Sequence, residues 1–111
     1  MAEYVPGPGE KVATKTRQKA KPKAEVKRPP MYKVLLHNDD YTTMDFVVHV
    51  LKTIFRKGTV DAVRIMLNVH RNGIGECGVY PAEIAETKVK EVHDLAQDNG
   101  YPLRCSMEPE Q

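Results

Sequence analysis

The sequence lacks any long apolar run. Nowhere in its 111 residues is there a stretch of roughly 18 consecutive apolar residues, the length that suggests a membrane-spanning helix. The first 30 residues contain no apolar core of the kind that secretory signal peptides carry. We therefore expect a protein with neither a membrane span nor a membrane partner.

Cysteine is also scarce. The only two cysteines, Cys77 and Cys105, are too few for the disulfide framework of a small secreted domain. Free thiols are typical of a reducing compartment. This favours a cytoplasmic protein, and the length allows one folded domain.

Large apolar residues are nearly absent from residues 1–30, which hold five of the eight prolines and eight Lys/Arg against three Glu. Such a segment cannot bury enough apolar surface to offset the entropy lost on ordering. The sequence therefore predicts a disordered, basic, Pro/Lys-rich tail over 1–30 and a single folded domain over 31–111.

Positive charge could indicate nucleic acid as a partner. The basic tail, however, has no interleaved aromatic residues, and residues 31–111 carry nine Lys/Arg against twelve Asp/Glu. We expect no nucleic-acid partner and favour a tail that contacts a protein. A basic-tailed, RNA-associated module remains an alternative.

The hydrophobic patterns predict six secondary-structure elements. Helical spacing is clear at Val47, Val50, Leu51 and Ile54, where one face of a helix repeats. The elements are strands over 31–38, 74–81 and 102–108, and helices over 43–57, 59–72 and 81–99. The order β-α-α-β-α-β predicts an α+β fold with three helices packed on a small, three-stranded, mostly antiparallel sheet.

Several residues predict where the helices begin. Thr42, with Asp45 three residues later, resembles a capping box, and Thr59 is in place to cap the second helix. Pro81 suits the first turn of the third helix. Glycines within the 74–81 strand indicate close packing or a bulge.

A candidate site follows from the predicted packing of the first two helices. If they are antiparallel, the end of the second lies beside the start of the first, next to the Asn-Asp-Asp sequence that ends the first strand. A pocket with an apolar floor and a polar rim would then form from Asn38, Asp39, Met44, Met66, Val69 and His70.

Catalytic interpretations of these residues are weaker. A small hydrolase could use His70 with Cys77 or Asp39, but no recognisable nucleophile motif surrounds them. His70 with Asp39 supplies too few ligands for a metal ion, which takes three or four protein ligands. We expect no metal and no cofactor.

Four stretches resemble the ClpS family, the adaptors of the bacterial Clp unfoldase–protease. They are "MYKVLLHNDDYTTMDFVVHVL", "RIMLNVHRNGIGECGVY", "AEIAETKV" and "YPLRCSME". The resemblance covers residues 30–108 and implies three helices on a three-stranded sheet, as the patterns already predict. It also implies a non-catalytic, monomeric protein rather than an enzyme.

The resemblance further implies a function. Family members bind N-degron proteins, whose first residue is a bulky Leu, Phe, Tyr or Trp. They deliver these to an AAA+ unfoldase through its N-terminal domain, here one that is ClpA-like, and the N-terminal extension assists the hand-over.

The site residues implied by the resemblance fall into four groups. The α-amino group would be held by Asn38, Asp39 and His70. The first side chain would enter a pocket of Met44, Val47, Met66, Val69 and Leu103, with Asp40 and Thr42 at the rim. The unfoldase would dock on Glu83 and Lys88.

Overall fold

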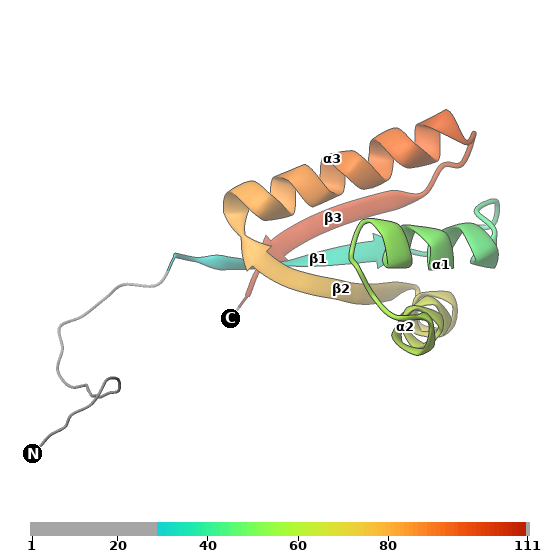
Figure 1. The fold of residues 1–111 in the computed structure, drawn as a ribbon, viewed down its shortest axis with the longest axis horizontal. Helices are drawn as coiled ribbons and strands as arrows, with labels where there is room; N and C mark the ends of the chain where they lie inside the picture. The colour runs from blue at the N-terminus through green and yellow to red at the C-terminus, as the bar shows by residue number, and fades with distance from the viewer. Residues whose placement is uncertain (1–28, 111) are drawn as a thin grey trace, which may run out of the picture.

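A computed structural model describes residues 29–110, so residues 1–28 of the predicted tail lie outside the described residues. The chain follows the predicted order β-α-α-β-α-β (Figure 1). Its elements are β1 (Met31–His37), α1 (Met44–Thr53), α2 (Thr59–Asn72), β2 (Ile74–Pro81), α3 (Ala82–Asp98) and β3 (Arg104–Pro109).

The sheet has the strand order β2-β1-β3, and β1 pairs antiparallel with both neighbours. His37 at the end of β1 lies opposite Ile74 on one side and Arg104 on the other. The register with β2 shifts between Val34 and Leu35, which is the irregularity that the glycines of this strand predicted. The predicted fold class is confirmed.

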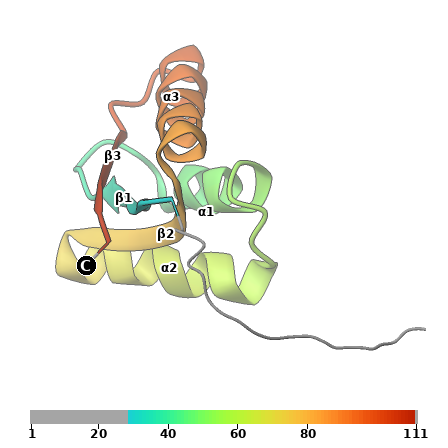
Figure 2. The ribbon, with the colours of Figure 1, turned by 90° about the vertical axis from the view of Figure 1, so that its left-hand side faces the viewer.

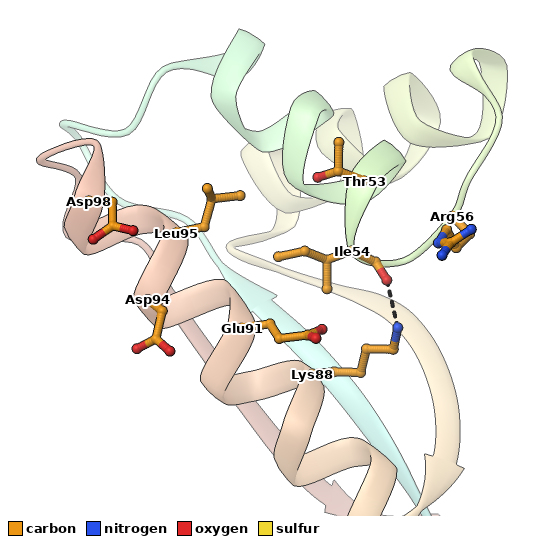
Figure 3. Close-up of a pocket in the computed structure, with 8 residues that line it drawn as sticks. All are labelled: Thr53, Ile54, Arg56, Lys88, Glu91, Asp94, Leu95 and Asp98. Carbon is orange, nitrogen blue, oxygen red and sulfur yellow. Dashed lines mark hydrogen bonds between the residues drawn. The ribbon is translucent and has the colours of Figure 1, made fainter.

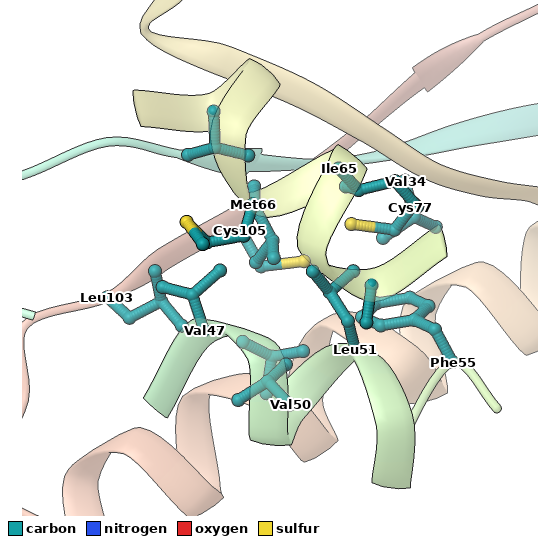
Figure 4. Packing of buried hydrophobic residues seen from close by; sticks show 14 of the residues in the cluster. Val34, Val47, Val50, Leu51, Phe55, Ile65, Met66, Cys77, Leu103 and Cys105 are labelled. Atoms are coloured by element: carbon teal, nitrogen blue, oxygen red, sulfur yellow. The ribbon is translucent and has the colours of Figure 1, made fainter. Parts of the chain in front are cut away.

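The three helices cover one face of the sheet and enclose the core (Figure 2). Val34 and Leu36 of β1 are fully buried beneath them. Each helix contributes a stripe of apolar side chains to the same cluster, and β3 adds Cys105 (Figure 4). The alternation that predicted a half-buried third strand is therefore correct.

The start of α1 differs from the prediction by one residue. The N-cap is Thr43, whose hydroxyl accepts a hydrogen bond from the backbone N–H of Phe46 at 3.1 Å. Thr42, the predicted cap, instead donates its hydroxyl to the carboxylate of Asp39 at 2.7 Å. Thr42 was the wrong choice because Thr43 directly precedes the first helical residue, while the Thr42 side chain is directed toward Asp39.

Other boundaries also moved. Helix α1 ends at Thr53 rather than 57, and Arg56 then adopts a left-handed φ of 58°. Gly58, not Thr59, is the N-cap of α2, without a side-chain hydrogen bond. Pro81 is the N-cap of α3 and not its first helical residue. These shifts leave the packing order intact.

Candidate functional site

The loop after β1 is joined to the end of α2 by backbone hydrogen bonds. The N–H of Asn38 donates to the carbonyl of Gly73 at 2.9 Å, and the N–H of Gly73 donates to the carbonyl of Val69 at 2.9 Å. Gly73 has a φ of 87° and ends α2, a left-handed conformation that glycine adopts without strain. This turn places His70, in the last turn of α2, beside the loop.

Asp39 organises the loop itself. Its Oδ1 accepts hydrogen bonds from the backbone N–H groups of Tyr41 and Thr42, at 2.8 and 2.7 Å. Its Oδ2 accepts the Thr42 hydroxyl. Burial acts to raise the pKa of Asp39, but the hydrogen bonds from Thr42 and Tyr41 outweigh it and hold the pKa below its usual value. The carboxylate is therefore charged at neutral pH, and one lone pair on Oδ2 stays available.

A cavity of about 230 Å³ opens between this loop and helices α1 and α2. It is smaller than the pockets of about 300–1,000 Å³ that hold drug-sized ligands, so it fits a single side chain better than a whole cofactor. Nine residues line it: Asn38, Asp39, Asp40, Thr42, Met44, Val47, Met66, Val69 and His70.

The cavity has an apolar interior and a polar mouth. Val47, Met66 and Val69 are buried, with Val69 only 2% exposed. Met44, at the first position of α1, is 45% exposed. Asn38 and His70 are exposed, and among the described residues no hydrogen bond engages their side chains. Acceptor groups thus surround the entrance to an apolar space.

Leu103 is the one predicted pocket residue that does not line the cavity. It is 3% exposed and belongs to the core cluster that also contains Val47 (Figure 4). Its side chain packs behind the cavity and supports the wall.

The two cysteines are unsuited to catalysis. Both are buried and free, and Cys77 is 1% exposed. Burial raises the pKa of Cys105 to about 12 and also raises the pKa of Cys77. A thiol with so high a pKa provides no thiolate nucleophile at neutral pH. In residues 29–110, no group of three or more potential ligands is placed to hold a metal ion.

The two predicted docking residues lie on α3. Glu83 is exposed in the first turn. Lys88 points toward the end of α1, where its Nζ donates to the carbonyl of Ile54 at 2.7 Å (Figure 3). The same ammonium lies 5.8 Å from the centre of the Tyr80 ring. Lys88 therefore connects α3 to the last turn of α1, a contact that no sequence pattern predicted.

Lys88 also lines a larger groove, of about 410 Å³, between α1 and α3. The groove contains the carboxylates of Glu91, Asp94 and Asp98, and Asp94 is paired with Lys90 at 2.7 Å. Its charged groups lie on both sides and do not converge on one point (Figure 3). The groove is larger than the cavity beside His70, but its volume alone does not make it the better candidate for a binding site.

Comparisons with known proteins show which family the chain resembles. The family model described as ATP-dependent Clp protease adaptor protein ClpS matches residues 27–106. Relatives named ATP-dependent Clp protease adapter protein ClpS include one from Desulfatibacillum aliphaticivorans, 62% identical over 80% of this chain and 86% of the relative. One from Myxococcus xanthus is 60% identical over 81% and 84%.

A solved structure of a related protein has the same fold as this chain. The structure of Agrobacterium tumefaciens ClpS2 bound to L-phenylalaninamide is 47% identical to this chain, with a TM-score of 0.72. The match covers 75% of this chain and 100% of that one.

Fold and sequence together define a small α+β adaptor of a proteolytic machine. The chain belongs to the ClpS family of ATP-dependent Clp protease adaptors. It is a non-catalytic adaptor, as expected, and its partner is the Clp protease. Neither the hydrolase nor the RNA-associated alternative is supported. None of the helices within 29–110 combines the length and hydropathy needed to cross a membrane.

Proposed function

We propose that this adaptor binds proteins whose first residue is a bulky Leu, Phe, Tyr or Trp and delivers them to a ClpA-like AAA+ unfoldase. The observation that carries the proposal is the cavity beneath Asn38, Asp39 and His70. It combines an apolar interior with acceptors at its mouth, which matches the two groups of a free N-terminal residue.

The α-amino group provides the first half of the recognition. Its intrinsic pKa is about 7.7–8.0, so near neutral pH it is mostly an ammonium with three N–H donors. Asn38 offers a carbonyl oxygen, Asp39 its remaining lone pair, and His70 one ring nitrogen. Three acceptors for three donors satisfy the ammonium while it leaves bulk water.

The first side chain provides the second half. It would enter between Met44 and Val47 on α1 and Met66 and Val69 on α2, where the walls are apolar. The related Agrobacterium tumefaciens protein was solved with L-phenylalaninamide, a compound that has a free α-amino group and an aromatic side chain. That ligand has the chemistry expected of the occupant here.

The energetics explain why both halves are needed. Hydrogen bonds to charged groups contribute about 1.5–3 kcal/mol each, and burial of a Leu or Phe side chain contributes about 1.5–3 kcal/mol. Lost translational and rotational freedom opposes association by about 4 kcal/mol or more. Micromolar affinity, about −8 kcal/mol, therefore requires the ammonium and the side chain together.

Delivery would use another surface. Glu83 and Lys88 are the residues on α3 that we expect the unfoldase N-terminal domain to contact. They belong to a different element from the cavity walls. Substrate and unfoldase could therefore be bound at once by a single adaptor molecule.

The test is a set of labelled peptides that differ only in the first residue, measured by fluorescence anisotropy. Leu, Phe, Tyr and Trp peptides should bind, and the Gly peptide should bind at least about tenfold more weakly, because it buries no side chain. Equal affinity across the set would contradict the proposal.

A further inference from the structure

Gly75 of β2 lies directly behind the cavity wall. It is buried near the start of the edge strand β2 and pairs with Leu36 of the central strand. A Cβ built on Gly75 would lie 2.6 Å from Cγ2 of Val69, and 3.4 Å from the backbone N of Val69 and the carbonyl oxygen of Ile65. Helix α2 therefore packs against β2 at a distance that no larger residue permits without movement.

The backbone itself does not demand glycine here. Among the described residues, positive φ values in glycine occur only at Gly73 and Gly100. Gly75 is thus present for the close approach of Val69, not for an unusual conformation. Val69 is β-branched and helical, which restricts it to essentially one χ1 rotamer. It cannot easily turn aside from an added methyl group.

Val69 packs against Gly75 of β2 and also lines the cavity. A group that displaces Val69 away from β2 would narrow the space that the first side chain of a substrate would enter. We propose that Gly75 is a specificity-determining position, which sets the depth of the cavity by letting Val69 lie back against β2. The inference rests on the proposed function of the cavity.

Gly75→Ala should therefore weaken binding in proportion to the size of the first residue. We expect a loss of about tenfold for a Trp peptide and less than about threefold for a Leu peptide, because overpacking excludes the largest side chain first. The measurement is anisotropy with Leu, Phe and Trp peptides on the full chain.

Gly58→Ala is the matched control. Gly58 has a φ of −70°, and a Cβ added there would have nothing within 4 Å, so the same substitution should leave the ranking of peptides unchanged. Val69→Ala removes the atom that the new methyl group would strike. Gly75→Ala should consequently have little further effect in a Val69→Ala background, a non-additive result.

Each outcome decides a different point. If the parent binds none of the peptides, the proposed function fails and this inference with it. If the parent binds but Gly75→Ala weakens all peptides equally or none, only the role of Gly75 is overturned. If Gly75→Ala does not fold, the double variant should regain a cooperative thermal transition, and its failure to do so would overturn the contact with Val69.

Discussion

Asp39 has two tasks that the structure allows us to separate. Its carboxylate accepts three hydrogen bonds that hold the loop between β1 and α1 in shape. It also brings a negative charge to the mouth of the cavity. An asparagine would retain most of the first task and lose the second.

We predict that Asp39→Asn reduces the affinity for a Phe peptide at least about tenfold, since a charge-assisted hydrogen bond is lost. The asparagine Oδ1 can still accept from both backbone N–H groups, so stability should fall by less than about 1 kcal/mol. Asp39→Ala should lower both. Chemical denaturation and anisotropy measure the two effects, and full affinity in Asp39→Asn would exclude Asp39 as the ammonium partner.

The pH dependence follows from the lowered pKa of Asp39. A carboxyl group whose pKa is lower in the folded protein stabilises the fold above its unfolded-state pKa, and the stabilisation is lost as pH falls through the folded value. The difference in melting temperature between the parent and Asp39→Asn should therefore shrink between about pH 5 and about pH 3. A difference that grows in this range would contradict the assignment.

Met44 is the exposed wall of the cavity. Truncation to alanine should widen the entrance and admit the β-branched residues Val and Ile, which the methionine would otherwise exclude. We predict that Met44→Ala gains affinity for Val and Ile peptides by about tenfold relative to the parent. Continued rejection of these peptides would mean that Met44 is not the gate.

At the level of elements, the sequence predicted the type and order of all six but not every boundary. Periodicity reports which side chains face the core, and Val47, Val50 and Leu51 of the predicted helical face are buried there. The ends of the helices depend on tertiary contacts, which the hydrophobic periodicity does not reveal. Thr43 rather than Thr42 caps α1, while the Thr42 hydroxyl binds Asp39. Helix α1 ends where Lys88, 34 residues away along the chain, reaches the carbonyl of Ile54.

This contact gives a prediction for α3. Lys88→Ala removes the hydrogen bond to Ile54 and the ammonium near Tyr80, so it should destabilise the fold by about 1 kcal/mol. Glu83→Ala, at an exposed position, should change stability by no more than about 0.5 kcal/mol. Thermal unfolding of both variants measures this.

The pair also tests docking. If both residues contact the unfoldase, both variants should bind its N-terminal domain more weakly, but only Lys88→Ala should melt earlier. Unchanged binding by Glu83→Ala would remove it from the docking surface. Lys88→Ala alone could not decide the matter, because its effect on α1 would accompany any lost contact.

For the whole molecule, the candidate site could largely be predicted because it is assembled from the ends of neighbouring elements. The predicted antiparallel packing of α1 and α2 was wrong, since the two helices cross steeply (Figure 1). His70 nevertheless lies beside the loop, because the N–H of Asn38 binds the carbonyl of Gly73 at the end of α2. The position of Leu103 was not predictable at the same level, since it precedes β3 and joins the core cluster instead of lining the cavity. From the sequence, the glycine at position 75 indicated only that another group packs closely against β2. The structure identifies that group as Val69.

A cavity large enough for one side chain, with acceptor groups at its mouth, suits a protein that recognises substrates without altering them. Binding should therefore depend on the N-terminus being free as well as on the residue that occupies it. Acetylation removes the charge of the α-amino group and two of its donors while leaving the side chain unchanged. It thus separates the two halves of the recognition in a single step.

The most direct test compares a Phe peptide with its N-acetylated form by fluorescence anisotropy on the full chain. We predict that acetylation weakens binding by about a hundredfold or more, because the charge-assisted hydrogen bonds are lost and the Asp39 carboxylate is left desolvated. Equal affinities for the two peptides would contradict the account.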